Sequence, residues 1–187
     1  MKSQVAILAI GLAVAMPQAK AAEEHGPHEH GAGRLQLAVE KGDVEIELAL
    51  PGVDVVGFEH AAESAENRQA AEAAMAKLRD GAALFRFPAA AGCRLEKVDV
   101  NLMTGGHDDE HGKEHAHDKK HEHERESGHT EFRAHYHFHC DAPAKAQPLD
   151  VRVFAAFPSL HEIRALTISA AGQGAMELTP DATSLKF

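Results

Sequence analysis

Hydrophobic and polar residues alternate along two neighbouring segments in the first third of the chain. Leucine and valine occupy every second position of residues 35–39, and valine, isoleucine and leucine do so in residues 44–50. A period of two is typical of a strand with one buried face. Lys41-Gly42-Asp43 between them has the composition of a turn. The two segments therefore predict a β-hairpin that ends at Pro51-Gly52.

The pattern changes to helical spacing after residue 64. Ser64 is a suitable N-cap, and Gly81 is a suitable stop. Between them the apolar positions form one stripe, at Ala71, Ala74, Met75 and Leu78. We expect one main helix that packs on a sheet.

Shorter apolar runs follow in the rest of the chain. We expect a strand or turn at residues 84–87, strands at Leu149–Phe154, residues 163–168 and Ala175–Leu178, and a tight turn at Gly172-Gln173-Gly174. With two longer strands at residues 94–103 and 131–140, the expected fold is α+β. It is mostly antiparallel β, with about seven strands and one main helix.

The first residues have a different character. Lys2 precedes a continuous apolar run, Val5–Met16, and Ala19-Lys20-Ala21 has the small-x-small pattern of a cleavage site. This arrangement is typical of a secretory signal peptide, and the run is short for a membrane span, which needs about 20 apolar residues. We therefore expect residues 1–22 to be removed on export to the periplasm. An uncleaved anchor is the alternative. We do not expect the mature chain to be embedded in a membrane.

Export bears on the two cysteines, Cys93 and Cys140. An even pair in an oxidising compartment is most simply a disulfide, and a pair of zinc thiolates is the alternative. A disulfide would close the hairpin of residues 94–103 and 131–140 at one end. If the cysteines lie opposite each other, Phe138 shares a face with Leu95, whereas the apolar residues from Val98 onward point the other way. A bulge, or two partly buried faces, would resolve the conflict.

The segment inside this hairpin is the most unusual part of the chain. Residues 104–128 consist mainly of Gly, His, Asp, Glu and Lys, which cannot bury enough apolar surface to offset the entropy of ordering. We expect one domain over residues 34–187 with a disordered insertion at 104–128, after a flexible histidine-containing arm at 23–33. Six insertion histidines come at chelating spacings: His107, His111, His115, His117, His121 and His123.

Imidazole is a common ligand for zinc, copper and nickel, so this composition predicts metal binding, most simply of Zn²⁺. An inert solvated spacer is the alternative. A preorganised site would have to lie on the folded domain. The candidates stand at predicted element boundaries: His28, His30, His60 and His129. His135, His137 and His139 share one strand face, but alternate residues lie about 6.7 Å apart, too far to chelate one ion without help.

Charge and motifs narrow the function further. The net charge is −10, and it becomes −12 without Lys2 and Lys20. Such a chain repels nucleic acid and attracts cations. The sequence contains no H-E-x-x-H, G-x-S-x-G or phosphate-loop motif, so we expect a binding protein with no catalytic residues rather than an enzyme.

Several short motifs, in order, resemble the ZrgA-like family of periplasmic zinc-uptake proteins. They include HEHG at His28–Gly31, VGFEHA at Val56–Ala61, AAGC at Ala90–Cys93, HTEF followed by A-x-Y-x-F-x-C at Ala134–Cys140, and GQG with ELT at Gly172–Thr179. The resemblance implies that His28, His30, His60 and His129 match family histidines. It also implies a zinc-binding protein that serves an inner-membrane ABC-type zinc importer. The alternative function is a periplasmic sink or chaperone for copper or nickel.

Overall fold

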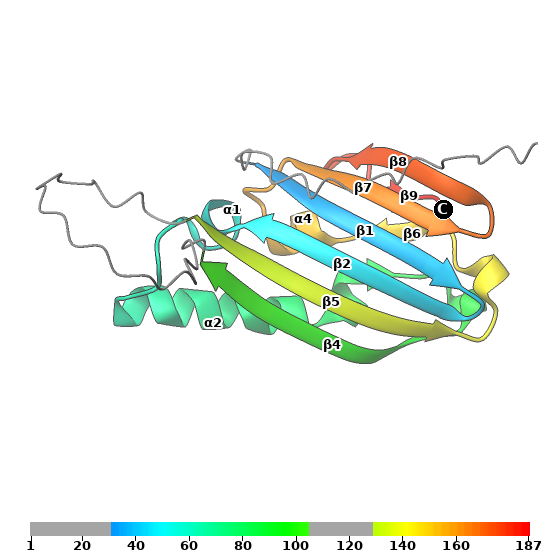
Figure 1. Cartoon of the computed structure of the whole chain (residues 1–187), viewed down its shortest axis with the longest axis horizontal. Helices are drawn as coiled ribbons and strands as arrows, with labels where there is room; N and C mark the ends of the chain where they lie inside the picture. Colours follow the sequence, from blue (N-terminus) through cyan, green and yellow to red (C-terminus); the bar gives the residue numbers. More distant parts are fainter. Residues whose placement is uncertain (1–30, 105–128) are drawn as a thin grey trace, which may run out of the picture.

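The computed structural model describes residues 31–104 and 129–187, and its largest feature is a six-stranded sheet (Figure 1). The strand order is β4-β5-β2-β1-β7-β8. The bounds are β1 Ala32–Glu40, β2 Asp43–Pro51, β4 Cys93–Thr104, β5 Thr130–Cys140, β7 Glu162–Ser169 and β8 Gly172–Leu178. All neighbours are antiparallel except β1 and β7, which are parallel.

The predicted alternation decides which face of this sheet is buried. Leu35 and Leu37 of β1 and the apolar residues of β2 are almost inaccessible, whereas the residues between them face outward or are only partly covered. Strand β5 follows the same rule, with Phe132, Ala134, Tyr136 and Phe138 on the buried face. The predicted first hairpin is confirmed.

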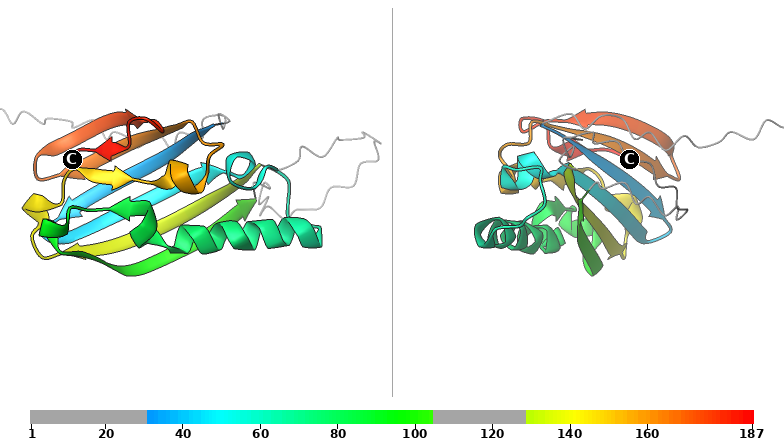
Figure 2. Two further views of the ribbon diagram at one scale, coloured as in Figure 1. Left: turned by 180° about the vertical axis from the view of Figure 1, so that it is seen from behind. Right: turned by 60° about the vertical axis from the view of Figure 1, so that its left-hand side comes forward.

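The remaining elements of the described residues all lie on the buried face, as Figure 2 shows, and none of them covers the opposite face, which we call the open face. Helix α2 (Ala65–Arg79) begins at Ser64, whose hydroxyl accepts a hydrogen bond from the Asn67 N–H at 3.0 Å. At its other end the buried Tyr136 hydroxyl donates to the Leu78 carbonyl at 2.8 Å. The smaller elements are α1 (Gly52–Val56), α3 (Gly81–Leu84), α4 (Val153–Ala156), η1 (Ala89–Ala91), η2 (Pro143–Lys145) and a second sheet of β3 (Phe85–Arg86), β6 (Leu149–Val151) and β9 (Ser184–Leu185).

The β4–β5 hairpin resolves the predicted register conflict. Cys93 and Cys140 form a disulfide directly across the two strands, at the end away from the insertion. A register shift between Leu95 and Lys97 then brings the later apolar residues of β4 onto the same face as Leu95, so that Val98 lies opposite Tyr136. The predicted disulfide is confirmed, and of the two alternatives for the register conflict the structure has the bulge.

Two sequence expectations in the last third of the chain are wrong. The predicted strand at Leu149–Phe154 stops at Val151, and α4 begins at Val153. The predicted turn at Gly172-Gln173-Gly174 belongs to β8, which begins at Gly172 after a turn at residues 170–171.

Asp150 of β6 is held by side-chain hydrogen bonds. Arg152 Nε donates to one of its oxygens at 2.9 Å and the Thr183 hydroxyl to the other at 2.8 Å. The Arg152 bond is the main cause of a pKa for Asp150 below its usual value. The ionised carboxylate therefore links β6 to the residue before β9.

The fold class agrees with the α+β prediction, with nine strands and one long helix in the described part of the chain. No helix in residues 31–104 or 129–187 is long and apolar enough to cross a membrane.

Candidate functional site

One end of the large sheet gathers the ends of four strands. Here β1 and β5 begin and β2 and β4 end (Figure 1). Thr104 pairs with Thr130, and Pro51 pairs with Glu131. We call this end the open end of the sheet. Of the four predicted folded-site histidines, His60 and His129 are described, and both belong to this end: His129 directly precedes β5, and His60 follows α1.

The segment that carries His60 is held close to the start of β5. After β2 the chain turns through α1, and Gly57 closes that helix with a left-handed backbone, φ 83°. Gly52 lies so close to this junction that a β-carbon there would clash with Thr130 Oγ1. The Thr130 hydroxyl donates to the Phe58 carbonyl at 3.4 Å. Glu59 and His60 are thereby placed beside β5.

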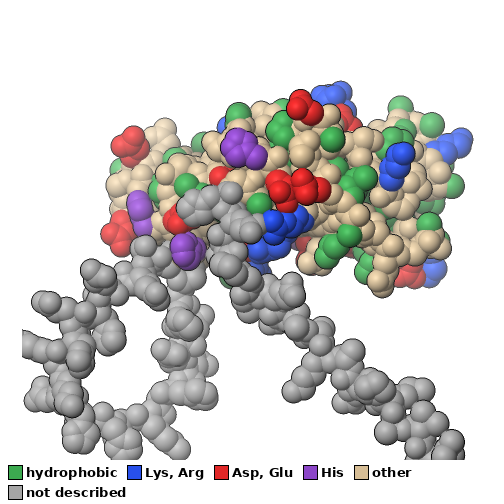
Figure 3. All heavy atoms as spheres, turned by 90° about the horizontal axis from the view of Figure 1, so that it is seen from above, with side chains coloured by type: hydrophobic (Ala, Val, Ile, Leu, Met, Phe, Trp, Pro, Cys, Tyr) green, Lys and Arg blue, Asp and Glu red, His purple; other side chains and the backbone are tan. Residues whose placement is uncertain are grey.

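His129 and His60 each have one ring nitrogen against an oxygen. His129 Nδ1 lies 2.9 Å from Glu59 Oε2, and His60 Nδ1 lies 2.9 Å from the Ala61 carbonyl oxygen. The His60 ring also stacks on Phe58, with 5.0 Å between ring centroids. Figure 3 shows histidine side chains near acidic ones at this end of the molecule.

These contacts determine which nitrogen of each neutral ring can bind a metal. A carbonyl oxygen or an ionised carboxylate carries no proton, so in each pair the imidazole Nδ1–H is the donor. The lone pair of the neutral ring then lies on Nε2. Histidines that ligate metals usually donate their other N–H to a carboxylate or a backbone carbonyl in this way, which orients the ring. His60 and His129 both have this arrangement.

The entry point of β1 belongs to the same end. The Gly31 N–H donates to the buried Asp54 carboxylate of α1 at 2.8 Å, and the Gly31 carbonyl accepts from the His161 N–H at 2.8 Å. Gly31 adopts a left-handed backbone, φ 83°. These bonds hold Gly31, the residue directly after His30, between α1 and the start of β7.

A buried carboxylate anchors the first residues of β5. Glu131 is almost inaccessible, and it accepts hydrogen bonds from Arg34 of β1 and from Arg133. Because a buried charge is costly unless it is paired, these bonds fix Glu131 and with it the backbone next to His129.

The described residues supply only part of the predicted metal site. Within residues 31–104 and 129–187, no three His, Cys, Asp or Glu side chains converge as a formed metal site. The two other predicted ligands, His28 and His30, lie outside the described residues. So do the six insertion histidines, His107, His111, His115, His117, His121 and His123.

Comparison with known protein families shows the family to which the chain belongs. A family model described as "ZrgA family zinc uptake protein" matches residues 27–187. The chain belongs to the ZrgA family of zinc uptake proteins. The match spans the entire described region and all four predicted folded-site histidines, so the predicted ZrgA resemblance is confirmed. No curated protein matches the chain.

The structure adds residues to the candidate site of this chain that sequence reasoning did not single out. Glu59 precedes His60 within the motif VGFEHA, but its partner is His129, 70 residues away. Asp54 of α1 lies two residues before this motif, and its carboxylate accepts a hydrogen bond from the Gly31 N–H. The sequence shows that the Glu59 carboxylate is next to a predicted ligand, His60. It does not show that Glu59 contacts His129, because that contact depends on β2 and β5 being neighbours.

Proposed function

We propose that this chain is a periplasmic zinc-binding protein that captures Zn²⁺ and supports its uptake through an inner-membrane ABC-type importer. The folded site lies at the open end of the sheet. Its ligands are His60 and His129, completed by His28 and His30. It acts by binding and release, without catalysis.

The paired Nδ1 contacts of His60 and His129 are the observation that carries this proposal. Both rings come from segments far apart in the sequence, and both are oriented through Nδ1 by an oxygen. Orientation before binding reduces the entropy lost when a metal is ligated, so a site on this rigid edge is more selective than a site on a polar loop. Membership of a zinc uptake family supports zinc as the metal.

The position of the histidine-rich insertion supports a second role, the collection of zinc. The insertion joins Thr104 to the start of β5, and Thr104 pairs with Thr130 at the open end. Ligands in residues 105–128 are therefore attached beside the folded site. The short tether gives the insertion a high effective concentration near that site. We propose that insertion histidines bind additional zinc and pass it to the folded site.

Calorimetric zinc titration of the full mature chain tests both roles. The His60→Ala/His129→Ala double variant should lose the tightest binding event and keep the weaker ones. Replacement of residues 105–128 by a short Gly/Ser linker should keep the tightest binding event and remove the weaker ones. The matched control is His161→Ala, which replaces an exposed histidine at the same end. It should leave both the tightest and the weaker binding events unchanged. Tight binding that survives the double variant would refute the folded site, and unchanged stoichiometry without the insertion would refute the collecting role.

Growth of a deletion strain tests the uptake role separately. A strain without the gene should grow poorly when zinc is limiting, and the wild-type gene should restore growth whereas the His60→Ala/His129→Ala gene should not. Sensitivity to excess copper or nickel, with normal growth under zinc limitation, would instead identify a metal sink.

A further inference from the structure

A second cluster of histidines lies on the open face of the sheet, at the opposite end from His129. His135, His137 and His139 of β5 face outward, and Asp43 and Glu45 of β2 lie beside them. His139 pairs with Asp43 in the register, and His137 pairs with Glu45. His129 and His139 are ten residue steps apart, which is about 33 Å of extended strand, so the two sites are well separated.

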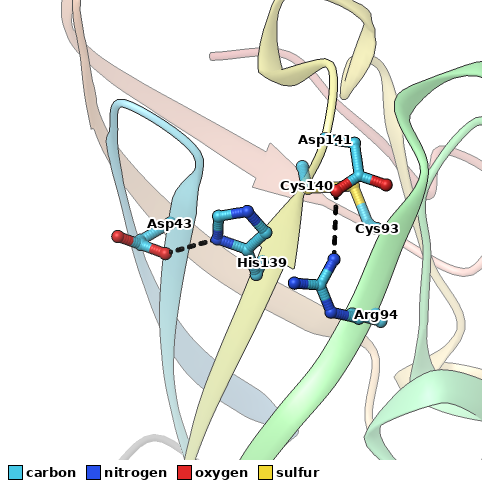
Figure 4. Close-up of a disulfide and its surroundings, with 6 residues drawn as sticks. All are labelled: Asp43, Cys93, Arg94, His139, Cys140 and Asp141. Atoms are coloured by element: carbon cyan, nitrogen blue, oxygen red, sulfur yellow. Dashed lines mark hydrogen bonds and ion pairs between the residues drawn. A yellow bond between two sulfur atoms is a disulfide. The ribbon is translucent and has the colours of Figure 1, made fainter.

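The His137 ring and two carboxylates of this cluster lie at distances close to those between ligands of one metal. His137 Nε2 lies 3.5 Å from Asp43 Oδ1 and 3.7 Å from Glu45 Oε1. His139 Nδ1 lies 2.9 Å from the same Asp43 oxygen, and this contact is a hydrogen bond (Figure 4). The His139 nitrogen therefore has to give up its proton before it can bind a metal. Two ligands of a tetrahedral zinc ion with bonds of 2.0–2.2 Å are about 3.3–3.6 Å apart. Asp43 therefore already joins the two imidazoles that strand spacing alone would keep apart.

One oxygen in the cluster has no hydrogen bond. Glu45 Oε2 is shielded from solvent and accepts no hydrogen bond. His135 Nε2 lies 3.1 Å away, within ion-pair distance, and the Glu45 side chain as a whole is 44% exposed. A shielded carboxylate oxygen without a donor is costly, and a cation would satisfy it.

The surroundings leave room for an ion. A hollow on this face is lined by Ala38, Glu40, Lys41, Asp43, Glu45 and His137. The small Ala38 side chain of β1 lies beside Glu45 in the register.

Basic groups also lie near the cluster, and most of them are engaged. Arg94 is paired with Asp141 at 3.1 Å and with Glu96 at 3.2 Å, and Lys41 with Glu40 at 3.4 Å. Lys97 lies opposite His137 in the register.

We propose that His137, His139, Asp43 and Glu45 form a second zinc-binding site on the sheet face, next to the disulfide. Among the described residues, no three of these side chains converge on one point, so this site requires side-chain rotation when the metal binds. The identity of the metal rests on the proposed function, whereas the site rests on these contacts alone.

Histidine footprinting on the full mature chain tests this site residue by residue. Diethylpyrocarbonate modifies imidazole nitrogens that are not bound to metal, and mass spectrometry locates each modification. With zinc at ten times the dissociation constant, His137 and His139 should react about tenfold more slowly than without zinc. The Glu45→Gln variant should lose this protection. The matched control Glu177→Gln, an exposed glutamate of β8 on the same face, should keep it.

The outcomes separate the two proposals. If zinc protects His60 and His129 but not His137 and His139, the sheet-face site is refuted and the proposed function stands. If zinc protects no histidine, both are refuted. Protection that survives Glu45→Gln would exclude Glu45 as a ligand and overturn the four-residue site. Far-UV circular dichroism confirms that each variant is folded.

Discussion

Glu59 is the side chain whose replacement tests the geometry of the folded site most finely. It contacts His129 Nδ1 at 2.9 Å, and we assign it a positioning role: it fixes the ring and makes Nε2 a better ligand. Glu59→Gln keeps an oxygen that accepts the Nδ1–H hydrogen bond but removes the charge. Glu59→Ala removes both.

The size of the effect follows from the exposure of the pair. Loss of a partner of this kind typically costs 10–100-fold in metal affinity, which is about 1.4–2.7 kcal/mol. The His129 side chain is 57% exposed and that of Glu59 22%, so water screens part of the interaction. We therefore expect Glu59→Gln to weaken tight zinc binding by about tenfold and Glu59→Ala by somewhat more.

The assay is a zinc competition titration against a chromophoric chelator at pH 7.5. It is run on the full mature chain and on the chain with residues 105–128 replaced by a short linker, so that insertion sites do not obscure the result. Glu63→Gln, an exposed glutamate in the same loop, is the matched control and should change nothing. Equal affinity for Glu59→Gln, Glu59→Ala and the wild type would show that His129 is not a zinc ligand oriented by Glu59.

Four further predictions concern stability and pH. Tyr136→Phe should lower the free energy of unfolding in urea by about 1–2 kcal/mol, because it leaves the buried Leu78 carbonyl without a donor; an unchanged midpoint would contradict this. The Cys93→Ser/Cys140→Ser variant should lose up to about 4 kcal/mol, because the disulfide closes a segment of 47 residues, and thermal unfolding of both forms measures the loss. Asp150→Asn should destabilise the chain by less than about 1 kcal/mol at pH 7, because the lowered pKa of Asp150 adds stability above its ordinary value of 3.8. This effect should shrink as the pH falls below 3.8, and an effect that does not change with pH would refute it. Zinc should dissociate below about pH 6, where ligand histidines become protonated, and a dissociation constant independent of pH between 5 and 7.5 would exclude histidine ligation.

Local patterns predicted the parts of the fold in which one face is clearly buried. The alternation in residues 35–50 and 131–140 and the helical stripe ending at Leu78 each correspond to an element of the structure. The register conflict in β4 was visible in the sequence, because with the cysteines paired Leu95 and Val98 face the same side only if one extra residue lies between them. The sequence left two solutions open, and the structure has the bulge.

Short apolar runs were less informative. Leu149–Phe154 is too brief for its period to distinguish strand from helix, and the chain forms both, with β6 ending at Val151 and α4 starting at Val153. In β7, Leu166 and Ile168 are more than half exposed, whereas Thr167 is buried. Hydrophobicity alone would have placed Leu166 and Ile168 on the buried face and Thr167 on the exposed face.

Long-range strand pairing limited the prediction of the sites. Glu59 meets His129, and Asp43 meets His139, only because β2 lies next to β5, and no local pattern in residues 43–51 indicates that neighbour. Sequence reasoning identified the histidines by type and spacing. Their carboxylate partners depend on register, so they could be found only in the structure.

Metal analysis of the protein isolated from its native compartment tests the central claim most directly. We predict that zinc is the main bound metal, with at least one equivalent retained after removal of residues 105–128 and lost in the His60→Ala/His129→Ala variant. Copper or nickel in place of zinc, or zinc content unaffected by that double variant, would contradict the account.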